Sequence, residues 1–293
     1  MKVLITGASG QVGRALQESA PSEVALRALT RSDLDISDAR AVQTAVTAWQ
    51  PAVIINAAAY TAVDKAESEP EASLAINADG PRHLAQAALG IPGCRLMHIS
   101  TDYVFDGGSA EPYGPADPTH PLSVYGRGKL LGEQAVMEIL ADRGVILRTA
   151  WVYAAQGKNF LLTMLRLMRE RGAVRVVADQ FGSPTSADSI ARALWVIAGH
   201  PEVHGVLHWT DAGKTTWYDF ARAIAEEGAA AGILPPAIEV TAITTAQYPT
   251  AARRPASSVL DTRRSVEILG IAPPPWRAQL RATLARLASA SGG

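Results

Sequence analysis

The sequence predicts an α/β fold in which a Rossmann-type doubly wound parallel sheet is joined to a smaller, mixed α/β part. Three observations predict it. Short β-rich runs alternate with longer stretches of helical period, as in a parallel sheet with crossover helices. These runs are solidly apolar, which is typical of strands covered on both faces. A glycine-rich turn, G-A-S-G-Q-V-G, follows the first run directly and opens the first helical segment.

The first half of the chain contains the expected sheet and its helices. Its apolar runs predict strands at Lys2–Thr6, Val24–Leu29, Ala52–Ala57, Arg95–Ser100 and Val145–Thr149. Helices are expected between them because apolar residues recur at helical spacing behind a start signal, at Gln11–Ser19, Asp38–Trp49, Pro70–Leu89 and Val124–Ala141. We therefore assign residues 1–150 to a Rossmann domain.

The second half has a looser pattern, which proline-rich pieces interrupt. Helical spacing predicts helices at Asn159–Arg171, Ala187–Ala198, Tyr218–Ala231 and Trp276–Leu287. Strands are expected at Val174–Ala178 and Val206–Thr210. Residues 151–293 are expected to bind mainly the substrate, and some of their segments could return to the first domain.

Composition and charge restrict the class of partner. The chain has 293 residues, 48% of them apolar, and a formal net charge of −1, which argues against a nucleic-acid or anionic-membrane surface and favours a small molecule. The single cysteine, Cys94, cannot form an internal disulfide. The N-terminal apolar run is too short for a signal peptide, and no later run reaches the length of a membrane span, so a cytoplasmic protein is expected.

The glycine-rich turn predicts a dinucleotide site. Gly7, Gly10 and Gly13 stand where the backbone must turn sharply, approach a pyrophosphate and let the helix pack on the strand. The helix N-terminus attracts the phosphates. An ordinary glycine turn is the alternative, but the place after the first strand favours an NAD(P) site, with the spacing G-x-x-G-x-x-G.

The end of the second strand indicates which dinucleotide is bound. A carboxylate there would bind the ribose diol of NAD and repel the additional phosphate of NADP. The stretch L-T-R-S-D instead offers Thr30, Arg31 and Ser32, which favours NADPH and leaves NADH open. Asp35 follows as a candidate contact of the adenine.

Tyr125 and Lys129 form a Y-x-x-x-K pair on one face of a predicted helix. The unperturbed pKa of a tyrosine is about 10, and a neighbouring ammonium is expected to lower it towards the range of acid–base catalysis. The pair alone is weak evidence. The strand before it ends in Ser100, Thr101 and Asp102, at the sheet edge where such folds bind ligands.

Together these motifs resemble the extended short-chain dehydrogenase/reductase family, most of whose members act on nucleotide sugars. Within it, the chain is similar to the reductases of a dTDP-linked 4-ketosugar. The segments that carry the resemblance span nearly the whole chain: N-A-A-A-Y-T-A-V-D-K-A-E at 56–67, S-T-D-Y-V-F-D-G at 100–107, R-T-A-W-V-Y at 148–153, G-K-N-F at 157–160, D-Q-F-G-S-P-T at 179–185, T-W-Y-D-F-A at 216–221 and Y-P-T-A-A-R-R-P at 248–255.

The resemblance implies an enzyme that reduces the C4 ketone of the sugar with NADPH. It implies a catalytic set, in which Tyr125 protonates the alkoxide, Lys129 tunes Tyr125 and Thr101 orients the carbonyl. It places Gly10, Gln11 and Val12 on the pyrophosphate, Asp35 and Ile36 near the adenine, and Ala58, Ala59 and Tyr60 along the cofactor, which Tyr125 and Lys129 also contact. Val63, Thr101, Asp102, Tyr103 and Trp151 are implied to contact the substrate.

Several assignments stay open at this point. Arg253 and Arg254 can bind the substrate diphosphate with two hydrogen bonds each, or be a surface pair. Some members of the family are dimers bridged by magnesium through glutamates. Ala15 takes the first-helix position here and Asp188 is the one matching carboxylate, so magnesium is left open and a monomer or weak homodimer is expected. The histidines at 200, 204 and 208 receive no metal role.

Other functions of the same fold are alternatives. Dehydratases place a glutamate after S-T-D, where this chain has Tyr103, which argues against dehydration. Another nucleotide-sugar reductase or an epimerase would keep the same motifs. A non-catalytic NADP-binding regulatory subunit would have no need of Thr101, Tyr125 and Lys129.

Overall fold

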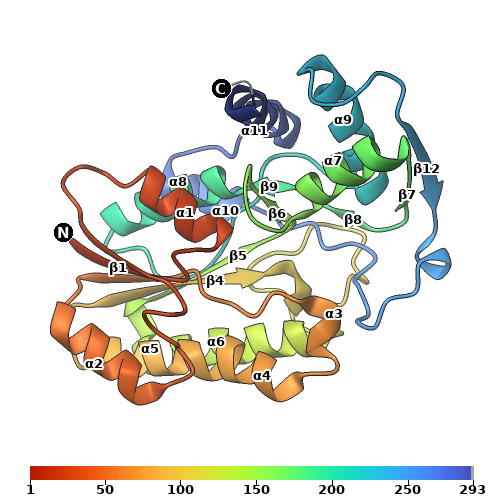
Figure 1. Cartoon of the computed structure of the whole chain (residues 1–293). Coiled ribbons are helices and arrows are strands. Elements are labelled where there is room, and N and C mark those ends of the chain that lie inside the picture. The colour runs from red at the N-terminus through yellow and green to blue at the C-terminus, as the bar shows by residue number, and fades with distance from the viewer. Residues whose placement is uncertain (292–293) are drawn as a thin grey trace.

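A six-stranded parallel sheet forms the centre of the protein, as seen in a computed structural model that describes residues 1–291 (Figure 1). Its strands lie in the order β10-β5-β4-β3-β1-β2. Their bounds are β1 Lys2–Thr6, β2 Ala25–Leu29, β3 Val53–Asn56, β4 Arg95–Thr101, β5 Gly144–Thr149 and β10 Gly205–His208. The strand order reverses at β1, because β2 lies on one side of it and β3 on the other. Ligands of doubly wound sheets bind at such a point, outside the carboxyl ends of the strands. The predicted fold class is confirmed.

Helices cover both faces of this sheet. One face packs against α1 (Gln11–Glu18), α8 (Ala187–Gly199) and α10 (Arg263–Leu269), and the other against α2 (Ala39–Trp49), α5 (Gly80–Leu89) and α6 (Val124–Leu140) (Figure 1). Strand β1 shows why the runs are solidly apolar. Val3 and Ile5 belong to the core on the α1 side, and Leu4 between them belongs to the core on the α2 side.

The segment predicted as one helix at 70–89 contains a local irregularity. It consists of α4 (Pro70–Leu74), a π-helical turn η1 (Ala75–Asp79) and α5, and α3 (Val63–Ala66) precedes it. Pro81 has no N–H to donate to the Asn77 carbonyl, which favours a wider turn here. The Asn77 side chain instead clamps the backbone of Tyr60, whose N–H donates to it over 2.9 Å.

A smaller part lies beside the sheet and has its own core. It contains α7 (Phe160–Arg171), α9 (Trp217–Ala230), α11 (Trp276–Ser291) and the parallel pair β7 (Ala173–Val177) and β12 (Glu239–Ile243). Two short pairs connect it to the rest: β6 (Val152–Tyr153) with β9 (Thr185–Ser186), and β8 (Phe181–Gly182) with β11 (Thr215–Thr216). Buried Tyr153, Phe220 and Leu280 belong to this core.

Most predicted elements lie within two residues of the observed ones. The elements that were not predicted include α3, α10, β12 and the two-residue strands β6, β8, β9 and β11. The segment that forms β12 follows L-P-P-A and is largely exposed, so it has no apolar run to mark it. Within residues 1–291, every helix is too short or too polar to cross a lipid bilayer.

Candidate active site

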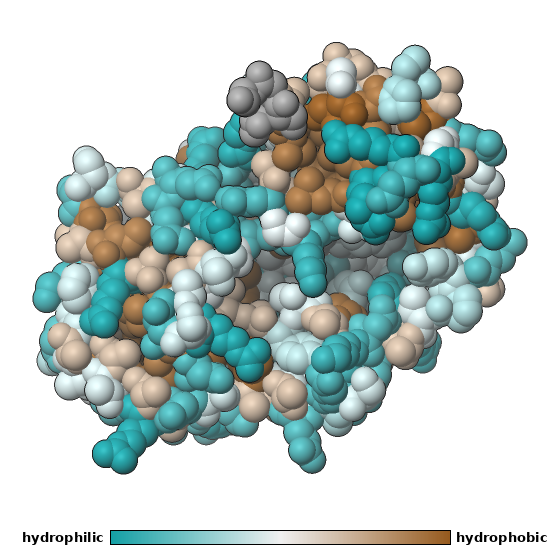
Figure 2. Space-filling model, viewed as in Figure 1, coloured by the Kyte–Doolittle hydropathy of each residue, from teal (hydrophilic) through white to brown (hydrophobic). Residues whose placement is uncertain are grey.

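Two adjoining cavities lie beyond the carboxyl ends of β1, β3 and β4. Their volumes are about 330 Å³ for the first cavity and about 550 Å³ for the second cavity. Both have walls formed by Gly10, Ala58 and Ala59. The face shown in Figure 2 is hollowed between the sheet part and the part that carries α7 and α9. One elongated ligand can therefore occupy both cavities.

The glycine turn has the geometry that a diphosphate requires. Gly7 has a φ of +71°, and a Cβ there would lie 2.5 Å from the Ala58 nitrogen. Gly10 caps α1 without a side-chain hydrogen bond, and no acidic residue stands in the first turn. The first amides of α1, at Gln11 and Val12 on the wall of the second cavity, are thus available to an anion. The residues fit a dinucleotide.

Gly13 contributes through packing, since it lies outside both cavity walls. A Cβ at Gly13 would lie 2.2 Å from the Gly7 carbonyl oxygen. The missing side chain lets α1 approach the turn closely, as the third glycine of this motif is expected to do.

The predicted adenine end lies in the first cavity. Arg31, Asp35, Ile36 and Tyr60 line it. The Arg31 side chain is 78% exposed, and its guanidinium is 3.9 Å from the Asp35 carboxylate, so it is free to turn towards a ligand.

Thr30 is predicted to contact the cofactor but lies outside both cavity walls. Its hydroxyl donates to Asp33 over 2.6 Å, and its N–H donates to the same carboxylate over 2.9 Å. These bonds order the turn that presents Arg31. We therefore describe Thr30 as a residue that shapes the turn.

The three predicted catalytic residues line the second cavity together. Thr101 ends β4, and Tyr125 and Lys129 lie one turn apart on α6. The Ser123 side chain caps α6 by accepting the Gly126 N–H over 3.1 Å. A Cβ at Gly126 would lie 2.3 Å from the Tyr103 carbonyl oxygen, so this glycine lets the start of α6 approach the end of β4.

Burial dominates the electrostatics of the pair on α6. It raises the pKa of Tyr125 to about 12, against the hydrogen bond from Thr101, which lowers it. The expected lowering by Lys129 is not seen in the free protein, where Lys129 Nζ donates to the Ile99 carbonyl over 2.7 Å. Burial lowers the pKa of Lys129 to about 7.

Asp102 is a second unusual group in the second cavity. Burial raises the pKa of its carboxyl to about 6, and hydrogen bonds to Ser258 and Thr101 oppose the shift. The Thr101 hydroxyl is 3.0 Å from Oδ1. Oδ2 is buried and has no hydrogen-bond partner within residues 1–291, which leaves one acceptor beside the cavity unsatisfied.

The predicted substrate residues Val63, Asp102, Tyr103 and Trp151 also line the second cavity. The Trp151 indole stacks on Trp217, with ring centroids 3.5 Å apart and planes 6° apart. Trp217 lines the cavity too, and the sequence reasoning missed it. Trp217 belongs to the T-W-Y-D-F-A segment, one of those that carry the resemblance, and this is the feature of the sequence that could have identified it.

The predicted diphosphate partners Arg253 and Arg254 lie outside both cavity walls. Arg253 is exposed, and Arg254 forms a two-bond ion pair with Asp64, at 2.7 and 3.1 Å. A cation that does line the second cavity is Lys158 of the G-K-N-F segment, which the sequence reasoning left without a role. Lys158 lies in the connection between β6 and α7, and this position near the end of β5 is the feature that could have identified it.

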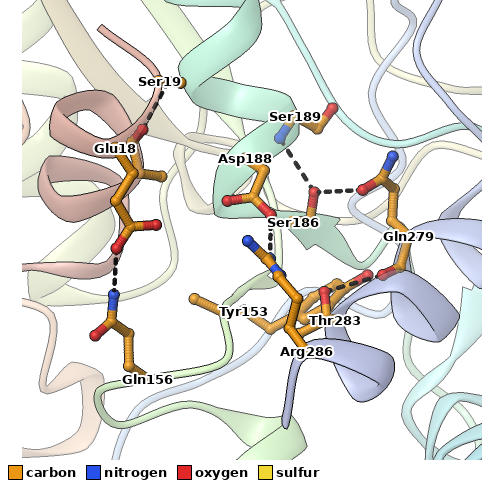
Figure 3. Close-up of polar contacts among 12 residues, drawn as sticks. Glu18, Ser19, Tyr153, Gln156, Ser186, Asp188, Ser189, Gln279, Thr283 and Arg286 are labelled. Atoms are coloured by element: carbon orange, nitrogen blue, oxygen red, sulfur yellow. Dashed lines mark hydrogen bonds and ion pairs between the residues drawn. The ribbon is translucent and has the colours of Figure 1, made fainter. Parts of the chain in front are cut away.

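The carboxylate matched to the magnesium site is engaged within the chain. Asp188, at the start of α8, forms an ion pair with Arg286 of α11, and the two side chains point at each other in Figure 3. Among residues 1–291, no group of three or more His, Cys, Asp or Glu side chains could hold a metal ion. The partner of this carboxylate is therefore a guanidinium of the same chain.

Comparisons with known proteins add to this geometry. A family model described as RmlD substrate binding domain matches residues 1–289. A dTDP-4-dehydrorhamnose reductase of Burkholderia thailandensis is 45% identical over 287 residues, which cover 94% of this chain and 96% of that protein.

Solved structures are similar over the same length. A dTDP-4-dehydrorhamnose reductase from Clostridium acetobutylicum superposes with a TM-score of 0.92 at 38% identity, covering 98% of this chain and 99% of that one. One from Bacillus anthracis, in complex with NADP, superposes with a TM-score of 0.90 at 35% identity, covering 97% and 99%.

Proposed function

The chain belongs to the RmlD substrate binding domain family, and from this membership we propose that it reduces the C4 ketone of dTDP-4-dehydro-6-deoxy-L-mannose with NADPH, which gives dTDP-L-rhamnose. One observation supports it above all others. Thr101, Tyr125 and Lys129 share a cavity that continues into the cavity beside the glycine turn. A ketone and a nicotinamide can thus meet beside one proton donor.

Each side chain has a defined part in this proposal. Bound NADPH would supply the hydride. The Tyr125 hydroxyl donates its proton to the alkoxide oxygen that forms at C4, and its raised pKa keeps that proton in place until then. Lys129, when protonated, stabilises the resulting phenolate. Thr101 orients the carbonyl through its hydroxyl.

The walls of the first cavity support NADPH as the reductant. We propose that Arg31 binds the 2′-phosphate, because its exposed guanidinium lies just after β2 on the wall of the first cavity. Replacing Arg31 with Ala should raise the KM for NADPH about tenfold, the value of one charge-assisted hydrogen bond, and the KM for NADH much less. Equal effects on both cofactors would contradict the assignment. Arg40→Ala, on the exposed side of α2, is the matched control.

Three finer statements belong to the same proposal. Arg254 and Lys158 are the candidate partners of the substrate diphosphate. The protein acts without a magnesium bridge, as a monomer or weak homodimer, because Arg286 pairs with Asp188. The reaction takes place in the cytoplasm, where reduced nicotinamide and nucleotide sugars are made.

The decisive experiment follows the absorbance of reduced nicotinamide when pure protein is mixed with the ketosugar nucleotide. NADPH and NADH are compared, each without and then with magnesium. We expect rapid loss that requires the sugar and does not require magnesium. Conversion of a sugar without any loss of absorbance would identify an epimerase instead, and NADPH binding without any conversion would identify a non-catalytic subunit.

A further inference from the structure

A line of buried polar side chains runs from β1 to the catalytic lysine. The Thr6 hydroxyl donates to Asn56 Oδ1 over 2.7 Å, and Asn56 Nδ2 is 2.9 Å from His98 Nδ1. His98 Nε2 is in turn 3.2 Å from Lys129 Nζ. All four side chains are buried, and His98 lies three residues before Thr101 on β4. Neither Asn56 nor His98 has a part in the reaction described so far.

The orientation of the Asn56 amide is fixed by the backbone. The Ala58 N–H donates to Asn56 Oδ1 over 3.1 Å, in addition to the Thr6 hydroxyl. A flipped amide would turn its own N–H groups against the Ala58 N–H. Asn56 Nδ2 therefore faces His98 and donates to Nδ1. A neutral imidazole that accepts at Nδ1 carries its proton on Nε2.

This proton is directed at Lys129. An Nε2–H can be accepted only by the lone pair of an uncharged amine, because an ammonium has none. Lys129 Nζ also donates to the Ile99 carbonyl over 2.7 Å, which an uncharged amine can do at the same time. Burial lowers the pKa of Lys129 to about 7, against the charge of Glu133, which raises it. Burial and the Lys129 charge together lower the pKa of His98 well below its usual value.

We propose that His98 is a positioning residue for Lys129, which it holds as an uncharged amine in the free protein by donating its Nε2–H to Nζ. The proposal rests on the proposed function, in which Lys129 acts on Tyr125. Protonation of Lys129 then requires that Nζ leave His98 or that His98 give up its bond from Asn56. His98 thereby lowers the affinity of Lys129 for a proton and sets the pH above which Tyr125 loses its ammonium partner.

Other charged groups around Lys129 do not supply this effect. Glu133, one turn further along α6, is held by Arg148 of β5 at 2.7 Å. Asp102, after β4, is bonded by Thr101. Glu67, at the end of α3, accepts the Val124 N–H over 2.8 Å at the start of α6.

The line of side chains is also not a proton path to solvent. It ends at Thr6 and at the Ala58 amide, and both Thr6 and Asn56 are buried. Its effect on Lys129 is therefore electrostatic and positional.

The tautomer itself provides the first test. In ¹⁵N-labelled free protein, the imidazole nitrogens of His98, assigned by their loss in His98→Asn, should show the neutral Nε2–H form between about pH 8 and 9, above the pKa of Lys129. An Nδ1–H tautomer or an imidazolium in that range would overturn the proposal. This measurement needs neither cofactor nor sugar, so it decides the matter even if the reductase function fails.

The second test follows the pH dependence of NADPH binding and of turnover. In His98→Asn the shorter amide reaches Asn56 but not Lys129 Nζ. The alkaline limb of the pH–turnover profile should therefore move up by about one pH unit, which corresponds to the free energy of one hydrogen bond. His98→Gln can place its amide N–H near Nζ and should keep the limb of the natural protein. An unmoved or lowered limb in His98→Asn contradicts the proposal.

A matched control separates this effect from a loss of stability. His208 is also a buried histidine, and its ring lies between the Tyr113 carbonyl and Arg148, outside both cavity walls. His208→Asn should lower the thermal stability as His98→Asn does and leave the alkaline limb in place. If the alkaline limb moves equally in His98→Asn and His208→Asn, the shift reflects a general loss of core packing. That result would also overturn the proposal.

Discussion

Tyr125 is the proton donor of the proposed reaction. Replacing Tyr125 with Phe removes the hydroxyl and keeps the ring, so we expect turnover to fall about 10²–10⁴-fold, the usual value of a general acid. NADPH binding, followed by fluorescence, should survive, because the glycine turn is untouched. Tyr153→Phe is the control, since this buried hydroxyl lies outside both cavities, where it contacts Thr283 and the Trp276 carbonyl. Normal turnover in Tyr125→Phe would remove the residue from the mechanism.

Asp211 is a buried carboxylate, and its effect on the free energy of unfolding depends on pH. Burial raises its pKa to about 7, its Oδ2 accepts the Ser186 N–H over 2.9 Å, and its Oδ1 has no partner within residues 1–291. Because the folded pKa is above the unfolded one, the folded state binds the additional proton. The contribution of protonated Asp211 to the free energy of unfolding is fully present below about pH 4, and it is lost as the pH rises through 7.

Replacing Asp211 with Asn removes the charge and keeps an acceptor for the Ser186 N–H. We expect the free energy of unfolding to rise by about 1–3 kcal/mol above pH 8, and by much less near pH 5. Chemical denaturation at the two pH values measures this difference. Asp179→Asn, at a carboxylate whose pKa hydrogen bonds from Thr245 lower, should show no such gain. A gain that is equal at both pH values would contradict the argument.

At the scale of elements, the glycine of β8 determines where the Trp151 indole lies. A Cβ at Gly182 would be 2.4 Å from the Trp151 ring, which cannot retreat because Trp217 stacks on it. Trp151 already has an unfavourable φ of +48°, so the β5–β6 connection has little freedom to adjust.

Gly182→Ala should therefore displace the indole into the second cavity. We expect the KM for the sugar nucleotide to rise at least about tenfold, since misplacement of about 1 Å costs more than that in some sites. NADPH binding should be unchanged. Gly199→Ala at the end of α8, where a Cβ would meet nothing within 4 Å, is the control. An unchanged KM in Gly182→Ala would show that the ring does not contact the substrate.

The elements also show what could be predicted from the sequence. Strands β1 and β3 to β5 are buried on both faces, so each is a bounded apolar run that the pattern finds within two residues. Strand β12 pairs with β7 at the edge of the molecule (Figure 1) and is mostly exposed, so its sequence lacks the run of apolar residues that marks a buried strand. The π-helical turn at Ala75–Asp79 depends on contacts with Tyr60, which lies outside its own sequence window.

At the scale of the whole molecule, the site residues come from distant segments, and this limited their prediction. The glycine turn and Y-x-x-x-K could be predicted because the residues of each motif are close in sequence and each motif has a recognisable context, the first strand and Ser100–Asp102. His98 and Trp217 were not, because their roles depend on Lys129 and Trp151, which the fold brings close to them. The same limit applies to Arg254, whose partner Asp64 lies 190 residues away.

The ion pair of Asp64 with Arg254 connects α3 to the segment between β12 and α10. The guanidinium is largely buried and makes bonds of 2.7 and 3.1 Å to the carboxylate, which also accepts the Ala252 N–H over 3.1 Å. If Arg254 binds the substrate diphosphate as proposed, it must exchange this carboxylate for phosphate oxygens. The ion pair then competes with the substrate and keeps the arginine in place between turnovers.

This competition predicts opposite effects of its two partners. Asp64→Asn leaves the arginine with a weaker partner and should lower the KM for the sugar nucleotide about threefold to tenfold, while Arg254→Ala should raise it by at least as much. Added salt should weaken substrate binding less in Arg254→Ala than in the natural protein, because a charged contact is gone. Asp261→Asn, which breaks an ion pair with Arg263 outside both cavities, is the control. If Asp64→Asn and Arg254→Ala raise the KM equally, the pair only braces the fold, and Lys158 is then the cation to test for the diphosphate.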